Sequence, residues 1–158
     1  MKHYFKYGSG YVNIDDENLY LTNSGNWQEA RELKEKSTAT ITENEIRIGK
    51  MKGFVYKVFG VIAIFIYYMV ENKTISISIF IGLGVLAYHV LQYFKSDFGK
   101  RYKIPLVKIE TVEKYNKGLK IIFRNENNEP DFEIIDNVEV KGFQILTNLN
   151  IISEFRHY

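Results

Sequence analysis

The acidic residues near the amino terminus form a compact group whose chemistry would be cation binding. Asp15, Asp16 and Glu17 follow one another directly, and Asn18 comes next. A calcium loop needs oxygen ligands at alternating positions and a glycine at its bend, and this group has neither. We therefore interpret it as a solvated turn between two short extended runs.

The histidines and the absence of cysteine restrict the chemistry further. His3, His89 and His157 are too far apart in sequence for a metal-ligand pattern, and the chain has no cysteine for disulfides or thiolate sites. His89 lies inside an apolar segment, where an ionisable side chain often transfers protons or bonds to a partner helix. The alternative is a solvated histidine near the end of that segment. No nucleophile, base and orienting group can be combined, so we expect a non-enzymatic protein without cofactor or metal.

Basic residues flank the apolar segment on both sides. Anionic lipid attracts such residues by roughly 1 kcal/mol each when they lie close to the membrane surface. Alternatively, they only set the orientation of the segment. The candidates for contact with anionic lipid headgroups are Lys50, Lys52, Lys95, Lys100, Arg101 and Lys103. The net charge is only +2, which argues against nucleic acid as a partner.

Residues 53–94 form the apolar segment itself. Two apolar runs, residues 55–70 and 74–94, are separated by the polar group Glu71, Asn72 and Lys73. A membrane helix needs roughly 20 apolar residues, and both runs approach that length, so the sequence predicts a transmembrane helical hairpin. A buried strand followed by a core helix is the alternative. A chain of 158 residues offers too little other apolar surface to enclose both runs.

Small residues within the second run would let helices approach closely. Ser76, Ser78, Gly82 and Gly84 are the candidates for helix–helix contact, and a homo-oligomer is one outcome. Basic residues precede the first run and follow the second, whereas the connector has a single lysine beside a glutamate. This asymmetry predicts that both termini are cytoplasmic and that the protein lies in the inner membrane.

The remaining segments alternate between strand-like and helical patterns. A four-residue polar turn between two short runs predicts a β-hairpin over residues 11–22, and alternation around an Asn turn predicts another over residues 38–49. The segment from Trp27 to Lys36 has the charge pattern of a short helix. Strands are expected over residues 102–106 with 108–115, 119–124 and 131–135, and Pro105 favours an edge strand or a strand start. Apolar residues recurring every three positions from Phe143 predict a closing amphipathic helix.

This combination of elements resembles the bacterial PH-like proteins, a PH/GRAM-type family. The stretch YKIPLVKIETVEKYNKGLKIIF, residues 102–123, carries the resemblance best, together with the closing helix, and residues 38–49 carry it more weakly. The resemblance implies an α+β fold: a mainly antiparallel β-sandwich or barrel with a carboxy-terminal capping helix, interrupted by the transmembrane hairpin. Residues 1–52 and 95–158 would form one cytoplasmic domain around the inserted segment 53–94.

Two hypotheses for function follow. The first is a membrane-anchored, non-enzymatic PH-like protein that binds a protein partner or anionic lipid headgroups at the cytoplasmic face, as the resemblance implies. The second is a small membrane effector or immunity component whose hairpin perturbs or protects the bilayer. Leakage of a dye from cells that express the chain would favour the second hypothesis.

Overall fold

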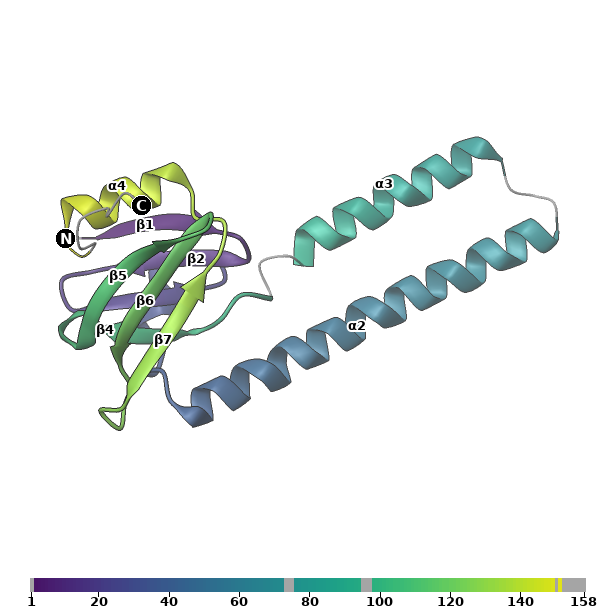
Figure 1. Cartoon of the computed structure of the whole chain (residues 1–158). Coiled ribbons are helices and arrows are strands. Elements are labelled where there is room, and N and C mark those ends of the chain that lie inside the picture. Colours follow the sequence, from purple (N-terminus) through teal and green to yellow (C-terminus); the bar gives the residue numbers. More distant parts are fainter. Residues whose placement is uncertain (1, 73–75, 95–97, 150, 152–158) are drawn as a thin grey trace.

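Two antiparallel sheets form the β domain of this chain (Figure 1). The computed structural model describes residues 2–72, 76–94, 98–149 and 151. One sheet is four-stranded, in the order β1-β2-β3-β4, and the other is three-stranded, in the order β5-β6-β7. The strands are β1 (His3–Tyr7), β2 (Gly10–Ile14), β3 (Asn18–Thr22), β4 (Tyr102–Pro105), β5 (Ile109–Tyr115), β6 (Gly118–Arg124) and β7 (Pro130–Ile135).

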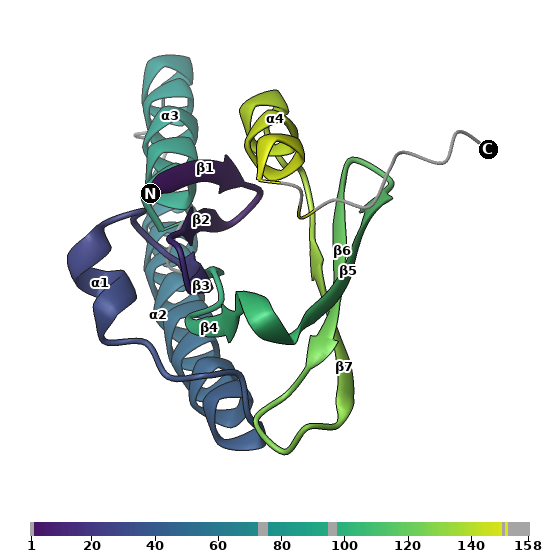
Figure 2. The same ribbon diagram turned by 90° about the vertical axis from the view of Figure 1, so that its left-hand side faces the viewer.

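The two sheets share one apolar core. Alternate residues of β6, namely Leu119, Ile121 and Phe123, are fully buried, as period-two patterning requires of a strand with one face inward. They pack in the same cluster as Phe5 of β1 and Ile104 of β4. The sheets stand opposite each other without closing into a barrel (Figure 2). The α+β class and the antiparallel sheets are confirmed, and β4 is an edge strand, as Pro105 predicts.

Helix α4 (Val140–Asn148) closes one end of the space between the sheets (Figure 2). Leu146 is fully buried in the shared core, and Phe143 packs against it. Close approach to β1 requires a glycine, because a Cβ atom at Gly142 would lie 2.5 Å from Cδ2 of Phe5. The predicted closing helix therefore exists, and Glu139 occupies its N-cap position.

The β-hairpin predicted over residues 38–49 is wrong. This stretch is the first part of a 34-residue helix, α2 (Thr38–Glu71). Ser37 caps it: its hydroxyl accepts the Thr40 N–H while Thr40 Oγ1 accepts the Ser37 N–H. The Thr42 hydroxyl donates to the Thr38 carbonyl, a bond that accommodates a β-branched residue in a helix. The alternation of apolar and polar residues fits both periods here, and the cap decides for the helix.

The short helix predicted from Trp27 to Lys36 is only partly present. Helix α1 (Trp27–Arg31) starts at the cap Asn26 and ends early. The chain then lies extended beside β4, where the Lys103 N–H donates to the Lys34 carbonyl over 2.9 Å. The segment between Arg31 and Thr38 therefore connects α1 to the long helix α2.

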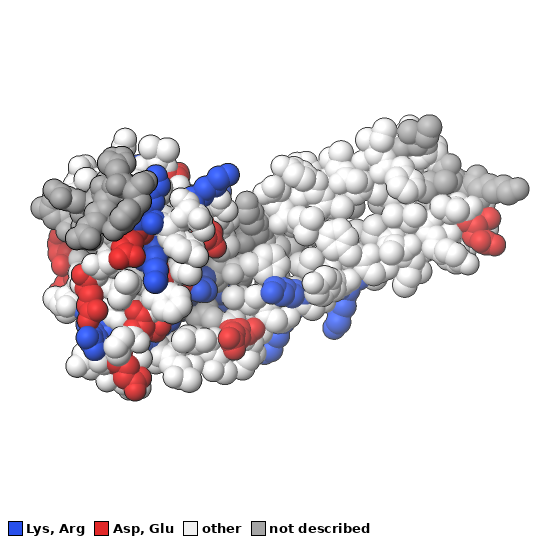
Figure 3. Space-filling model, viewed as in Figure 1, with Lys and Arg blue, Asp and Glu red and all other residues white. Residues whose placement is uncertain are grey.

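Helices α2 and α3 (Ile77–Phe94) extend away from the β domain and run in opposite chain directions (Figure 1). The rings of Phe54 and Phe94 meet near the domain, with centroids 5.6 Å apart. α2 is long and apolar enough to cross a membrane, whereas the apolar stretch of α3, Ser78–Phe94, is shorter. On the face shown in Figure 3, uncharged residues dominate the part of the two helices that lies away from the β domain.

Candidate functional site at the foot of α2

The first turns of α2 are fixed to the β domain by a buried amide. We call residues 38–53 of α2 the stem. On the stem, Asn44 is 7% exposed, and its Oδ1 accepts the Arg101 N–H over 2.9 Å while its Nδ2 donates to the Arg101 carbonyl over 3.0 Å. This pair of bonds imitates one step of a β-ladder. Arg47, one turn along the stem, donates to the Gly99 carbonyl and to Asn44 Oδ1. The chain segment that returns from α3 is therefore held against the stem.

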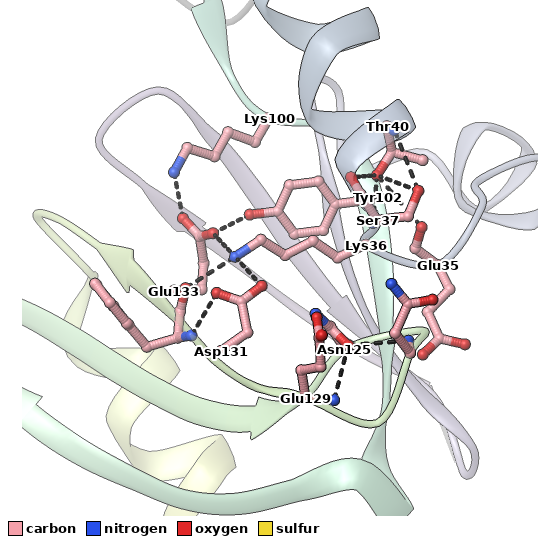
Figure 4. Close-up of polar contacts among 12 residues, drawn as sticks. Glu35, Lys36, Ser37, Thr40, Lys100, Tyr102, Asn125, Glu129, Asp131 and Glu133 are labelled. Atoms are coloured by element: carbon pink, nitrogen blue, oxygen red, sulfur yellow. Dashed lines mark hydrogen bonds and ion pairs between the residues drawn. The ribbon is translucent and has the colours of Figure 1, made fainter.

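A buried ionic cluster lies beside this contact (Figure 4). The Glu133 carboxylate of β7 is 3% exposed, and it lies 3.2 Å from the ammonium group of Lys36, which is also buried. Lys36 Nζ lies 3.0 Å from the Asp131 carboxylate and donates to the Phe132 carbonyl over 2.8 Å. Figure 4 shows Lys100 and Tyr102 also pointing at Glu133, with the Tyr102 side chain beside that of Lys36, and both donate to Glu133.

The composition of the cluster makes its burial tolerable. Two ammonium groups face two carboxylates, so the charges compensate one another, and the lone pairs of Glu133 are occupied by donors. Burial raises the pKa of Tyr102 far above its usual range, and the Glu133 carboxylate raises it further. Burial also raises the pKa of Tyr7 to about 12. Both phenols are therefore neutral at ordinary pH, and that of Tyr102 donates to Glu133.

A second ion pair ties α1 to the returning chain. Arg101 Nε lies 2.9 Å from Glu29 Oε1. Partial burial raises the pKa of Glu29, but donors from Asn23 and Ser24 and the charge of Arg101 outweigh burial and hold that pKa below its usual range. Glu29 is thus an ionised carboxylate that orients Arg101.

A cavity of about 320 Å³ opens between the stem and β7. The stem contributes Ile41, Asn44, Glu45 and Ile48, which recur at helical spacing and so share one face. Phe132 and Ile134 of β7 add apolar wall opposite the stem. Lys36, Lys100, Tyr102 and Glu133 of the ionic cluster complete the lining. The cavity is therefore apolar on two sides and charged at one end.

The predicted lipid-contact residues divide into two groups. Lys50 and Lys52 are exposed on the stem, close to the point where α2 becomes apolar. Lys100 and Arg101 are ion-paired within the domain, and Lys103 lies in β4 and pairs with Glu35, in the segment that connects α1 to α2. Lys95 lies outside the described residues. The predicted lipid-contact residues thus do not share one environment, and on the stem Lys50 and Lys52 are both exposed to solvent.

The residues predicted for helix–helix contact are exposed on α3 and just before it. Among the described atoms, a Cβ added at Gly82 or Gly84 would meet nothing within 4 Å. Ser76 and Ser78 are also exposed. Contact between these residues and a second copy of the chain stays a prediction. His89 is exposed on α3 as well, with its ring 5.8 Å from that of Tyr88.

The acidic turn is structural in the described chain. Asp15 Oδ1 accepts the N–H groups of Glu17 and Asn18, and Asp15 Oδ2 accepts the Tyr20 hydroxyl over 2.8 Å. Partial burial raises the pKa of Asp15, but these donors outweigh it and lower the pKa below its usual value. Trp27 packs its ring edge to face with Tyr20, with centroids 6.1 Å apart. Both features stabilise the β2–β3 end of the domain.

Sequence reasoning missed the residues that build the cluster and the cavity. Lys36, Tyr102 and Glu133 come from segments that are distant in sequence and meet only in the fold. One signal was available: in β7 the acidic residues Asp131 and Glu133 alternate with apolar Phe132 and Ile134. The charged face of this strand therefore points partly toward the core.

Comparisons with protein families, curated proteins and solved structures gave no match to this chain.

Proposed function

We propose that this chain is a membrane-anchored, non-enzymatic PH-like protein whose β domain is held at the cytoplasmic surface by a hairpin of α2 and α3. The observation that carries the proposal is the exposure of large apolar side chains along both helices. Tyr56, Ile64 and Tyr67 of α2 and Ile81 and Tyr93 of α3 are each more than 60% exposed. A continuous apolar surface of this extent is unfavourable in water, so we expect lipid or another protein to cover it.

The lengths of the helices support two membrane crossings. From Phe54 to Glu71, α2 rises by about 27 Å, and the 18 residues of α3 rise by the same amount. The hydrocarbon core of a bilayer is about 30 Å thick, so a small adjustment of the bilayer or of the flanking side chains accommodates both. Lys57 lies about one turn beyond Phe54 in α2 and is exposed, and its long side chain can reach the headgroups.

Charge supports the orientation. Lys50, Lys52 and Lys57 lie close to Phe54, where the apolar part of α2 starts, and Glu71 lies at its far end. Because positively charged flanks stay on the cytoplasmic side, we place the β domain and both termini in the cytoplasm and the hairpin in the inner membrane. The order of the four-stranded and three-stranded sheets, with a closing carboxy-terminal helix, supports the PH-like assignment.

Anionic lipid headgroups are the ligand that the surface near the membrane fits best. Lys52 and Lys50 precede Phe54 by about 3 and 6 Å along the helix axis, which places both within the headgroup layer. Roughly 1 kcal/mol of attraction to anionic lipid is expected for each. The free faces of the β domain remain available to a protein partner.

Membrane fractionation with site-specific labelling tests this proposal. The chain has no cysteine, so Lys50→Cys and Asn72→Cys each introduce one labelling site. We expect both variants in the membrane fraction, with Asn72→Cys labelled by an impermeant maleimide from outside intact spheroplasts and Lys50→Cys labelled only after lysis. Recovery in the soluble fraction would overturn the anchoring, and the reverse labelling pattern would overturn the orientation.

A further inference from the structure

The cavity between the stem and β7 has the size and lining of a small-molecule site. Ligand sites in proteins have volumes of roughly 300–1,000 Å³ and are mainly apolar, with a few polar groups that orient the ligand. At about 320 Å³, this cavity suits one short alkyl chain or ring system. Ile41 and Ile48 on one side and Phe132 and Ile134 on the other provide the apolar walls.

One cation at the charged end can turn to a ligand at low cost. The side chain of Lys100 is 50% exposed, whereas its partner Glu133 is 3% exposed. If Lys100 turns to an anion in the cavity, the buried Glu133 keeps the bonds from Lys36 and Tyr102, and Asp131, which shares Lys36, is 26% exposed and partly solvated. Lys36 cannot do the same, because Asp131 and Glu133 both depend on it.

The cavity lies close to the membrane surface that we propose. Ile48 precedes Phe54 by about 9 Å along the helix axis, just outside a headgroup layer that is roughly 5–8 Å thick. A molecule with an alkyl chain and a charged head can therefore exchange between the bilayer and the cavity over a short path.

An added peptide strand is a poorer occupant of this place. β7 is the edge of its sheet, but the Phe132 N–H already donates to Asp131 Oδ1 over 2.7 Å, and the Phe132 carbonyl accepts Lys36 Nζ over 2.8 Å. Charged side chains that satisfy an edge strand in this way protect it from pairing with another strand.

We propose that the cavity binds a single-chain anionic amphiphile of the fatty-acid class, with its alkyl chain between the stem and β7 and its carboxylate on Lys100. The inference rests on the proposed membrane anchoring, which supplies the source of the ligand. Glu45 is the acidic residue of the stem in the lining, and it weakens binding of an anion by repulsion.

Fluorescence quenching of the full chain in zwitterionic nanodiscs tests the site. Trp27 is the chain's one tryptophan, so the variant Trp27→Phe/Phe132→Trp places a single reporter at the cavity wall. We expect saturable quenching by bromododecanoate and much weaker quenching by bromododecyltrimethylammonium. In this background Lys100→Gln should weaken bromododecanoate binding up to about fivefold, the upper end of the range for a partly exposed ion pair. Glu45→Gln should strengthen it.

Matched variants separate the cavity from general lipid effects. Ile48→Gln removes apolar wall and should weaken quenching, whereas Lys114→Gln alters an exposed residue of β5 that does not line the cavity and should leave quenching unchanged. Equal quenching by both amphiphiles, or no response to Lys100→Gln and Ile48→Gln, would overturn the site. Flotation with liposomes is scored in parallel: a chain that floats but is not quenched refutes the site alone, and a chain that does not float refutes the anchoring.

Discussion

Glu133 is the residue whose environment is most demanding, because its carboxylate is enclosed and relies on Lys36 for a buried counter-charge. We expect Lys36→Met to lower the free energy of unfolding by about 3–5 kcal/mol, the usual cost of leaving a buried charge without its partner. Lys36→Met/Glu133→Gln removes both charges but keeps an acceptor for Tyr102, so it should recover much of the loss. Thermal unfolding followed by near-ultraviolet circular dichroism measures both effects.

An exposed ion pair provides the control for this experiment. Arg124 Nε lies 2.5 Å from Glu110 Oε1, and both side chains are more than 40% exposed. Breaking it with Arg124→Met should cost less than about 1 kcal/mol. If Lys36→Met costs no more than Arg124→Met, the cluster does not depend on compensation of a buried charge.

The buried phenols predict a loss of stability in alkali. The folded pKa of Tyr7 is about 12, above the value of about 10 for an unfolded tyrosine, and the folded pKa of Tyr102 is raised in the same direction. The folded state therefore holds these protons more tightly. Their contribution is fully present below pH 10 and is lost as the pH rises from about 10 to 12. The unfolding temperature should fall over this range, and less steeply in Tyr7→Phe. An equal slope in both proteins would contradict the assignment to Tyr7.

The sequence shows which residues near the apolar segment are charged, but it does not show which of them form ion pairs. Lys100 and Arg101 were recognised as basic residues near the apolar segment, yet the fold uses both in ion pairs. The partner of Lys100, Glu133, lies 33 positions away in the sequence, and the partner of Arg101, Glu29, lies 72 positions away. Spacing along the chain carries no information about such pairs, because they form only when three segments meet at the foot of α2.

Among the elements, the stem of α2 depends on Asn44 for its attachment. Asn44→Ala removes the acceptor of the Arg101 N–H and the donor to its carbonyl, and each buried polar group left unpaired costs about 1–3 kcal/mol. We expect a lower unfolding temperature and faster hydrogen exchange at the Arg101 amide. Exchange measured by mass spectrometry on peptides that contain residues 99–103 reports this directly.

Asn72→Ala is the matched change elsewhere in the same helix. Asn44 Nδ2 donates to the Thr40 carbonyl four residues earlier, and Asn72 Nδ2 donates in the same way to the Tyr68 carbonyl, but in an exposed position at the far end of α2. Its loss should change stability by less than about 0.5 kcal/mol. Unchanged exchange at Arg101 in Asn44→Ala would mean that the stem is held by other contacts.

The elements that sequence patterns predicted well are those with a single interpretation. The turn Asp15 to Asn18 separates two alternating runs, and β2 and β3 pair there as expected. The pattern of residues 38–49 fits both the strand period and the helix period. The local feature that indicates a helix is the capping box of Ser37 and Thr40 at the start of α2. A cap has to be read together with the helix that follows it.

For the whole molecule, the core and the apolar helices are separate structures. The residues of the shared apolar cluster lie outside residues 54–94 and come from both sheets, from α4 and from the turn before it, whereas Val55 of α2 is buried outside this cluster. The β domain therefore owes its packing to contacts on either side of the inserted segment, while the stem and the cluster around Glu133 connect the two. A change in the tilt of α2 would first act on the cavity, because the cavity is lined by the stem on one side and by β7 on the other.

This separation predicts that the β domain folds without the apolar helices. The rings of Phe54 and Phe94 lie 5.6 Å apart between centroids, so a short Gly-Ser linker in place of residues 54–94 can join the stem to the returning chain. Closing such a short loop costs little, since loop entropy changes slowly with length. We expect a soluble monomer with dispersed amide resonances and a cooperative unfolding transition, because the exposed apolar surface has been removed. The same deletion with Lys36→Met should unfold at a lower temperature. Aggregation of both shortened chains would show instead that the β domain needs the hairpin in order to fold.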